Sequence, residues 1–580
     1  MHWPGRTALA RCADSLAVPP GVARALSLAA SAGHVCLPLA ELQAGEWQRD
    51  DAAPAIGAGE LRDRLLRSGL VATETQAVDA TLSAQPMVVD DGDRLYLRRF
   101  FDLERRLAVA LAARARARTD DAAGADVVAL LGELFPARAG ASAPDRQRLA
   151  VALALQGRLT VISGGPGTGK TTTVAALLAC LLQGDPDLRI ALAAPTGKAA
   201  ARMLEALRGR AAALPPALRA RLPDEAFTVH RLLGVTPAPG RFRHHADNPL
   251  AVDVLVVDEA SMLDLALAAR LVAAVPPDAR LVLLGDKDQL AAVEAGAVFA
   301  ELSAALPDSV IALTESHRFR RDSGIGRLAA DINAGAGAAA LEWLQAGADD
   351  AAVWLEDTAV RPGPQTLACM EAGYAPYLDT LQRSQGDAQA RAAAAFAAFD
   401  RFRVLVAVHE GPRGLAALNT HLERHLRAAL GLPAAMGAAA RWYAGRPLIV
   451  QRNDYLLGLY NGDIGLCLPD ERGELAVYFP RSDGGYRAIP PLRLPAHDTA
   501  FVLTVHKSQG SEFDAVLLVL PSGPNRVLTR ELLYTGVTRA ACRVTLAGPP
   551  QVFAAACAAR TRRHAGLAVR LERGAAGALR

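Results

Sequence analysis

The segment Gly164–Thr171 reads Gly-Gly-Pro-Gly-Thr-Gly-Lys-Thr and carries the residue types needed to bind a nucleoside triphosphate. Glycines let backbone N–H groups close around phosphate oxygens, and the helix that should follow adds a favourable dipole. We therefore predict a phosphate-binding loop in which Lys170 reaches the β- and γ-phosphates of ATP and Thr171 ligates Mg²⁺. The loop itself consists of Gly164, Gly165, Pro166, Gly167, Thr168 and Gly169.

Two carboxylates follow the apolar stretch 254–257, which is typical of a buried strand. We predict that Asp258 holds the Mg²⁺ shell and that Glu259 activates the water that attacks the γ-phosphate. An Asp-Glu pair at this place favours hydrolysis over a switch that only binds nucleotide.

Lysine is rare in this chain: only four of the 63 basic residues are lysine, and the others are arginine. An ammonium is compact, whereas a guanidinium is a wide planar fork, so the two are not interchangeable. The lysines are therefore candidates for sites where only an ammonium fits. They are Lys170, Lys198, Lys287 and Lys507.

The composition excludes several classes of protein. A formal charge of +3 over 580 residues excludes a polybasic protein, and the length alone suggests roughly four domains. We find no uncharged apolar run of 18 residues and no signal peptide, and the seven cysteines form no Cys-x-x-Cys pair. We therefore expect a cytoplasmic protein with reduced thiols and no membrane association.

Short apolar stretches alternate with helical patterns from Gln147 onward, which predicts an α/β fold with parallel sheets. The first series of strands is expected at Leu159–Ser163, Arg189–Ala193, Val252–Val257, Arg280–Leu284 and Ser309–Leu313. A second series is expected at Arg403–Val408, Ala500–Val505, Ala515–Leu520 and Cys542–Ala547. Tight turns separate three further strands, which predict a small inserted antiparallel barrel. These are Leu448–Gln451, Ile464–Leu468 and Leu475–Phe479.

These patterns divide the chain into three regions. Residues 1–125 lack a catalytic signature and are expected to be a mainly helical interaction domain, with helices at Gly59–Leu70 and Leu103–Arg118 and a hairpin at Met87–Leu97. Residues 126–330 should form the first ATPase domain, with a projecting insertion at about 234–251. Residues 331–580 should form the second, with the antiparallel insertion at about 445–500. The stretch 137–145 is expected to be a linker.

The motifs resemble, in order, those of superfamily 1 helicases of the 5′→3′ branch, and within it the RecD family, the alpha subunits of exodeoxyribonuclease V. The resemblance covers about Gln147 to Ala540. Besides the phosphate-binding loop it rests on Ala194–Ala200, Thr228–Leu233, Asp258–Ser261, Gly285–Leu290, Ser316–Phe319, Thr504–Phe513, Tyr534–Ala540, Asn453–Tyr455 and Tyr460–Gly465. All four lysines lie in these motifs. The resemblance implies two RecA-like domains and an SH3-like insertion, and Gly536 departs mildly from the family's last motif.

The resemblance also implies roles around ATP. Gln147 would read adenine with its amide, and Gln289 would sense the γ-phosphate from the end of a strand. Arg318 and Arg539 would each offer a guanidinium to the transferring phosphate, from opposite sides of the cleft. The alternative for each arginine is an ordinary surface salt bridge.

The DNA track should cross both ATPase domains. Candidate phosphate or sugar contacts are Thr196, Lys198, Thr504 and His506. His506 could instead be a core histidine. The basic segment 241–245 lies where this branch carries its strand-separating pin, and a solvated loop is the alternative.

The implied function is that of an ATP-dependent 5′→3′ DNA helicase, the motor subunit of a RecBCD complex in double-strand-break repair and recombination. It would act on single-stranded DNA and duplex ends beside RecB-like and RecC-like subunits in a heterotrimer. No acid-x-Lys triplet and no His-x-His cluster occurs, so we expect no intrinsic nuclease and no relaxase. One alternative is a stand-alone RecD-like helicase, which the compact N-terminal region disfavours. Another is a non-motor P-loop protein, which Gln289, Arg318 and Arg539 disfavour.

Overall fold

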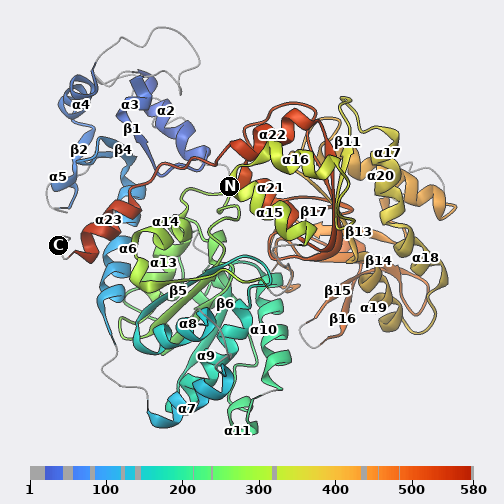
Figure 1. Ribbon diagram of the computed structural model, residues 1–580, viewed down its shortest axis with the longest axis horizontal. Coiled ribbons are helices and arrows are strands. Elements are labelled where there is room, and N and C mark those ends of the chain that lie inside the picture. Colours follow the sequence, from blue (N-terminus) through green and yellow to red (C-terminus); the bar gives the residue numbers. More distant parts are fainter. Residues whose placement is uncertain are drawn as a thin grey trace.

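Figure 1 shows the protein as a computed structural model. The structure describes residues 20–43, 57–78, 85–118, 124–136, 145–212, 214–236, 240–316, 323–432, 441–454, 456–481 and 484–576. Two α/β units lie side by side, and the N-terminal region packs on the first of them (Figure 1).

The first ATPase domain is built on a six-stranded parallel sheet with the strand order β10-β5-β9-β8-β6-β7. The strands are β5 (Leu159–Gly164), β6 (Ile190–Ala194), β7 (Phe227–Thr228), β8 (Val254–Val257), β9 (Arg280–Gly285) and β10 (Val310–Leu313). Side chains alternate between the two faces: Val161 packs in one core cluster and Ile162 in the other. Burial on both faces explains why these strands read as continuous apolar runs.

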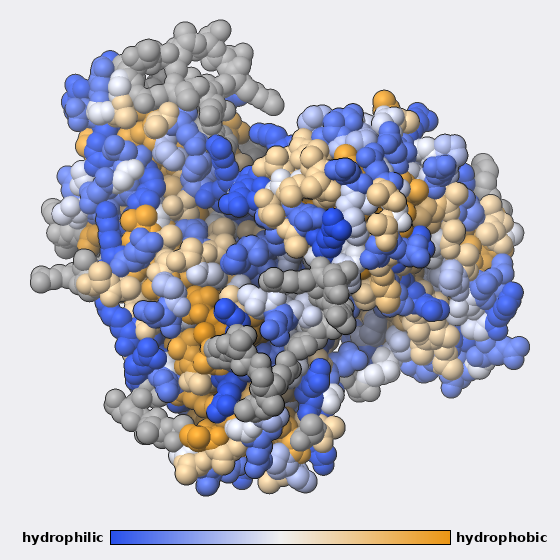
Figure 2. All heavy atoms as spheres, in the orientation of Figure 1, coloured by the Kyte–Doolittle hydropathy of each residue, from blue (hydrophilic) through white to orange (hydrophobic). Residues whose placement is uncertain are grey.

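Helices cover both faces of this sheet. One face carries α7 (Ala125–Leu134), α8 (Arg146–Gln156), α9 (Lys170–Gly184), α10 (Gly197–Ala211) and α11 (Pro216–Arg219). The other carries α6 (Arg98–Arg116), α12 (Val229–Leu233), α13 (Leu265–Ala274), α14 (Val298–Ala305) and α23 (Leu567–Ala575). In Figure 2 apolar side chains gather on the visible part of this domain, among mostly hydrophilic neighbours.

The second ATPase domain repeats this plan on a five-stranded parallel sheet with the order β11-β20-β19-β12-β18. The strands are β11 (Ala352–Glu356), β12 (Phe402–Val406), β18 (Val502–Thr504), β19 (Phe513–Val519) and β20 (Ala540–Gly548). One face carries α15 (Gly324–Ala334), α16 (Gly337–Gln345), α21 (Arg530–Val537) and α22 (Pro550–Ala558). The other carries α17 (Pro364–Gly373), α18 (Ala375–Arg383), α19 (Ala388–Phe399) and α20 (Leu415–Ala429).

A separate antiparallel sheet is inserted between α20 and β18, with the order β16-β15-β14-β13-β17. Its strands are β13 (Arg446–Val450), β14 (Ile464–Pro469), β15 (Leu475–Pro480), β16 (Tyr486–Ile489) and β17 (His497–Thr499). A small core of its own supports it, including Val450, Cys467 and Val477.

The N-terminal region combines helices with a four-stranded sheet of order β1-β4-β3-β2. The elements are α2 (Pro20–Ser31), β1 (Cys36–Pro38), α3 (Leu39–Gln43), α4 (Ala58–Arg67), β2 (Val71–Thr73), α5 (Glu74–Val78), β3 (Met87–Val89) and β4 (Arg94–Leu97). The predicted hairpin is present as β3 and β4. The expected linker lies, except for Asp145, outside the described residues.

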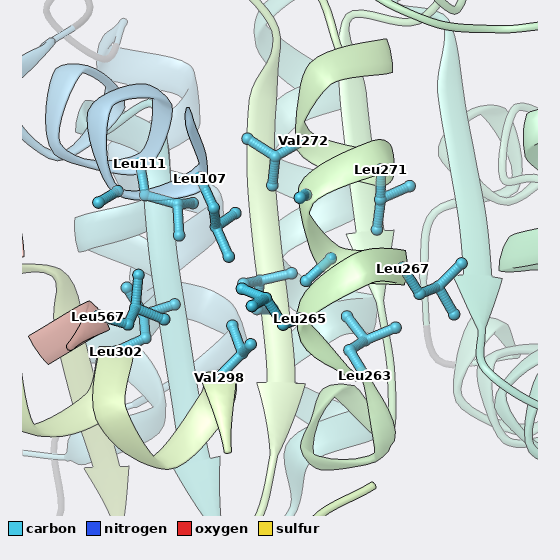
Figure 3. Close-up of a cluster of buried hydrophobic side chains, with 14 of the residues drawn as sticks. Leu107, Leu111, Leu263, Leu265, Leu267, Leu271, Val272, Val298, Leu302 and Leu567 are labelled. Atoms are coloured by element: carbon cyan, nitrogen blue, oxygen red, sulfur yellow. The ribbon is translucent and has the colours of Figure 1, made fainter. Parts of the chain in front are cut away.

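The C-terminal helix α23 follows the second ATPase domain in the sequence but packs beside α6 and α14 of the first (Figure 1). Figure 3 shows Leu567 of α23 facing Leu302 of α14 and Leu107 and Leu111 of α6. The end of the chain therefore belongs to the first core rather than to the domain predicted for residues 331–580. Likewise α15, which the predicted boundary at residue 330 divides, packs on α21 of the second domain.

A buried arginine connects α23 to α5, to α6 and to the residue after β3. Arg570 is 2% exposed, and its Nε donates to Glu104 Oε1 at 3.1 Å. Its other two nitrogens reach Glu74 and, at 3.5 Å, Asp90. Glu104 also accepts the Gly566 N–H at 2.9 Å, so both α23 and the residue before it are anchored to α6.

We expect Arg570→Ala to destabilise the packing of α23 by about 3 kcal/mol or more, because the buried carboxylates lose their cation. Hydrogen exchange of α6 and α23 in the full chain measures this change. The matched control is Arg573→Ala on the exposed side of the same helix, which should shift stability by less than about 0.5 kcal/mol. Equal exchange in both variants would contradict the anchoring role.

Candidate functional site: a nucleotide cleft between two domains

The predicted ATP-binding residues of the first domain follow the carboxyl ends of its parallel strands, which share one edge of the sheet. The phosphate-binding loop follows β5, Asp258 follows β8, and Asp286 follows β9. The central strands thus bring together residues that are more than 100 positions apart in the sequence.

The phosphate-binding loop has the backbone that its glycines allow. Gly167 and Gly169 have φ values of +75° and +85°, which L side chains rarely adopt. Helix α9 begins at Lys170, whose Nζ donates to the carbonyl oxygens of Gly164 at 2.5 Å and Gly165 at 3.1 Å. The ammonium therefore lies over the loop.

Both ATPase domains contribute walls to a cleft of about 480 Å³ beside this loop. The first domain lines it with Pro166, Gly167, Thr168, Gly169, Lys170, Thr171, Thr172, Ala199, Arg202, Met203, Ala206, Arg210, Asp258, Glu259 and Gln289. The second lines it with Gly510, Ser511, Glu512, Thr538 and Arg539. The structure thus brings the predicted loop, acidic pair, Gln289 and Arg539 into one cavity.

The acidic pair lies at a strained turn. Glu259 is one of two described non-glycine residues with a positive φ, at 51°, and its N–H donates to Asp258 Oδ1 at 2.8 Å. Burial and the neighbouring Glu259 raise the pKa of Asp258 to about 6, while Lys170 opposes the shift.

The donor chemistry of the cleft fits Mg²⁺. The Thr171 hydroxyl and the Asp258 carboxylate line the same cavity, and Mg²⁺ prefers such hard oxygen ligands. A divalent cation there would also offset the repulsion between Asp258 and Glu259.

Asp286 joins the two domains behind the cleft. This carboxylate is 3% exposed and accepts from Gln289 Nε2 at 3.1 Å and from the Tyr534 hydroxyl of the second domain at 2.9 Å. The Tyr534 hydroxyl also lies 2.8 Å from where a Cβ on Gly165 would stand. Tyr534 therefore contacts the phosphate-binding loop directly, although sequence reasoning gave it no role.

Two further hydrogen bonds cross the same interface. The Leu290 N–H donates to Thr535 Oγ1 at 2.9 Å, and Gln509 Nε2 donates to the Leu290 carbonyl at 2.8 Å. Gln289, the predicted γ-phosphate sensor, thus lies between Asp286 and Leu290, which both form hydrogen bonds with the second domain.

Arg539 lines the cleft from the second domain, and hydrogen bonds to backbone carbonyls fix its guanidinium. It is 3% exposed, and its Nε and Nη1 donate to the carbonyls of Thr535 and Ser511, both at 3.2 Å. Burial lowers its pKa. Arg318 lies outside the described residues, whereas Ser316 of the same motif donates to the Pro166 carbonyl at 3.1 Å.

Gln147 packs directly against the phosphate-binding loop. Its Nε2 donates to the Thr168 carbonyl at 3.2 Å and stands only 2.1 Å from where a Cβ on Gly169 would lie. Any side chain at Gly169 would displace this amide. The predicted contact with adenine remains untested.

The predicted DNA-contacting residues lie where the two domains meet. Thr196 caps α10 by accepting the Ala199 N–H at 3.2 Å, and Lys198 Nζ stands 5.7 Å from the ring centre of Phe513 in the second domain. Burial lowers the pKa of Lys198 to about 8. The DNA contacts themselves stay predictions.

The other two candidates lie at the end of β18. Thr504 is 3% exposed and accepts the Lys507 N–H at 3.2 Å, so its hydroxyl shapes the turn after the strand. His506 is partly buried, and burial lowers its pKa. Both proposed roles of His506 remain open.

A loop of the inserted antiparallel sheet lies close to the N-terminus of α10. A Cβ on Gly197 would stand 3.8 Å from Asp463 Oδ1 and 3.9 Å from Tyr460. On the other side Lys507 Nζ donates to Asn461 Oδ1 at 2.7 Å. The segment Tyr460–Gly465 therefore stands beside both predicted DNA-contacting motifs.

The described residues of the insertion expected at about 234–251, which leave out 237–239, form two short antiparallel bridges, between Val235 and Phe242 and between His245 and Asn248. Phe242 packs toward the domain: its ring centre lies 5.9 Å from that of His230 and 5.5 Å from the Arg270 guanidinium. The role as a strand-separating pin is untested.

No helix among the described residues is long and apolar enough to cross a membrane. Among the same described residues, no three or more His, Cys, Asp or Glu side chains lie close enough together to hold a metal ion by themselves.

Comparison with known sequences gives three family matches. Residues 147–295 match the AAA domain, residues 499–547 match the UvrD-like helicase C-terminal domain, and residues 10–96 match the N-terminal domain of RecBCD enzyme subunit RecD. The first two matches cover the cleft from both sides.

The chain is also similar to two relatives over most of its length and, more weakly, to one solved structure. The RecBCD enzyme subunit RecD of Mycobacterium tuberculosis is 42% identical over 510 residues, which cover 85% of this chain and 84% of that protein. The ATP-dependent RecD2 DNA helicase of Deinococcus radiodurans is 32% identical over 542 residues, covering 92% of this chain but 66% of that protein. A solved structure of Bacteroides Pif1 bound to single-stranded DNA matches with a TM-score of 0.37 at 16% identity, over 69% of this chain and 91% of that one.

The acidic pair yields a first test of the chemistry. We expect Glu259→Gln to lower DNA-stimulated ATP hydrolysis by about 10²-fold or more, because the attacking water loses its base, while a fluorescent ATP analogue still binds. Lys170→Ala should lose turnover and weaken binding as well. Substantial turnover by Glu259→Gln would rule out the proposed role.

Arg539 provides a second test of the chemistry. Arg539→Lys keeps the charge but loses the planar fork, so we expect the turnover number to fall by about 10³-fold with little change in ATP affinity. Steady-state kinetics at saturating DNA measure both quantities. If only the Michaelis constant changed, Arg539 would be a binding residue rather than an arginine finger.

Proposed function

Because the chain belongs to the RecD family of RecBCD enzyme subunits, we propose that it is the 5′→3′ DNA helicase subunit of a RecBCD-like complex. It hydrolyses ATP to move along one DNA strand and unwinds duplex ends. The complex contains RecB-like and RecC-like subunits and works in double-strand-break repair and recombination.

The main observation in support of this proposal is that both ATPase domains line one nucleotide cleft. Lys170, Asp258 and Glu259 come from one RecA-like domain and Arg539 from the other, and all line one cavity. Hydrolysis then needs both domains in place, so each turnover can open and close the interface. A nucleotide switch without movement would not need the second wall.

The residues divide the work of hydrolysis. Lys170 exchanges its two loop carbonyls for phosphate oxygens, and Glu259 accepts a proton from the attacking water. Arg539 adds positive charge as charge builds up on the γ-phosphate. Mg²⁺, held by Thr171 and Asp258, would neutralise phosphate charge when bound.

The junction at Asp286 supports coupling to movement. Gln289 lies beside the cleft and shares this carboxylate with Tyr534 of the second domain. A change at the γ-phosphate that moved Gln289 would therefore disturb a contact between the domains. The predicted DNA contacts, Thr196 and Lys198, lie on the same interface.

Two features favour a subunit over a stand-alone helicase. The chain is 42% identical to the mycobacterial RecD relative but 32% identical to the Deinococcus RecD2 helicase. The N-terminal region matches the N-terminal domain of RecBCD enzyme subunit RecD, which supports a docking role for it in such a complex. Cleavage is then left to another subunit.

Direction can be tested on tailed duplexes. We expect the purified chain by itself to displace strands from 5′-tailed but not from 3′-tailed substrates and to leave labelled DNA uncut in Mg²⁺; the same assay is repeated with partner chains. The Lys170→Ala variant, purified in the same way, controls for contaminating helicases. Unwinding from 3′ tails only would overturn the polarity, and Mg²⁺-dependent cleavage by the chain would overturn the division of labour.

A further inference from the structure

Arg202 of the first domain reaches across the cleft to the second. It lies on α10, one turn after Lys198, and lines the nucleotide cavity. Its Nη2 donates to Glu512 Oε2 at 2.5 Å and its Nη1 donates to the Gly510 carbonyl at 3.1 Å. A guanidinium can hold a carboxylate and a carbonyl at once, which an ammonium does less well.

The segment that Arg202 holds also holds Arg539. The Ser511 carbonyl, between the two Arg202 partners, accepts from Arg539 Nη1 at 3.2 Å. Three consecutive residues therefore join an arginine of the first domain to the predicted arginine finger of the second. The guanidinium groups do not need to touch for one to affect the other's position.

The same segment packs tightly against the start of α10. Gly510 has a φ of +71°, and a Cβ there would lie 3.4 Å from Ala199 Cβ and 3.6 Å from Thr196 Oγ1. The ring of Phe513, next after Glu512, faces Lys198. The position of the 510–513 segment therefore depends on the N-terminal turn of α10, which carries the predicted DNA contacts.

We propose that Arg202 is a positioning residue that, through Glu512 and the backbone of residues 510–511, sets Arg539 in the cleft according to the position of α10. DNA bound at the start of α10 would thus favour the arrangement in which Arg539 meets the γ-phosphate. This inference rests on the proposed DNA-stimulated ATPase and adds the connection between its two sites.

A competing role is direct contact between Arg202 and a phosphate, since Arg202 lines the same cavity. The two roles differ in what Glu512 does. If Arg202 works through Glu512, removing either partner breaks the same connection. If Arg202 binds phosphate by itself, removing Glu512 leaves that contact in place.

A double-mutant cycle separates the two roles. In the full chain, Arg202→Gln and Glu512→Gln should each lower the DNA-stimulated turnover number about 5-fold or more, with the Michaelis constant for ATP changed less than about 2-fold. The double variant should be no worse than the more damaging single variant. Losses that multiply, or a loss seen mainly in the Michaelis constant, would overturn the proposal.

The connection to Arg539 has its own test. In the Arg539→Lys background, Arg202→Gln should cause no further loss of turnover, because the residue that it positions is already replaced. A further loss equal to that in the wild-type background would show that Arg202 acts elsewhere and would overturn the proposal.

Arg189→Gln is the matched control. Arg189 forms an exposed ion pair with Asp253 at 2.6 Å inside the first domain, so its loss removes a similar pair without touching the interface. It should leave all parameters within about 2-fold, because exposed pairs contribute little. Thermal melting of every variant checks that the fold is intact.

The failure of this inference can be told apart from failure of the proposed function. If the wild-type chain shows no DNA-stimulated hydrolysis, the proposed function itself is wrong. If the wild type is stimulated and the Arg202 and Glu512 variants match the Arg189 control, only the positioning role is wrong.

Discussion

The buried carboxylate of Asp286 fixes the geometry on which the cleft depends. A carboxylate that is 3% exposed needs hydrogen-bond donors, because burying it without them costs several kcal/mol. Its donors come from both domains: the amide of Gln289 and the hydroxyl of Tyr534. The second domain is thereby brought against the phosphate-binding loop, and the cleft acquires the wall that carries Arg539. This shared carboxylate acts together with the other hydrogen bonds between the two domains, those of Leu290 with Thr535 and Gln509 and that of Arg202 with Glu512.

Among the described residues, arginine forms many of the side-chain hydrogen bonds and ion pairs between segments far apart in the sequence, as the composition leads one to expect. Arg570 links the C-terminal helix to Glu104 on α6, Arg202 links the two ATPase domains, and Arg413 forms a buried pair with Asp357. Lysine is used differently. Lys170 lies on the phosphate-binding loop, Lys198 lies at the interface of the two domains, and Lys507 donates to Asn461 of the inserted antiparallel sheet. Lys287, exposed beside Asp288, shows no feature that only an ammonium could satisfy.

The sequence was a good guide wherever the local pattern carries the information. Apolar runs predicted β5, β6, β8, β9 and β10 to within about two residues, and the spacing of glycines predicted the phosphate-binding loop. The parallel α/β fold and the separate antiparallel sheet are confirmed. Strands β1, β2, β7, β11, β16 and β17 were not predicted, since they are short and, unlike the equally short β8, are not buried along their whole length. The roles of Tyr534, Arg202 and Glu512 were missed because each depends on a contact between residues more than 200 positions apart.

The path of the chain also limits how the cleft can open. After α22 ends at Ala558, residues 559–566 return to the first core, where α23 packs on α6. Arg563 in this stretch donates to the carbonyls of Glu294 and Gly296, at 2.5 and 2.9 Å, close to the end of the motif that holds Asp286 and Gln289. The second domain therefore cannot drift away as a free body. Any change in the angle between the domains would have to keep these contacts, because α23 and Arg563 stay attached to the first core. Within the described part of the chain, the side of the cleft formed by Arg539 carries no such connection, so we expect opening there.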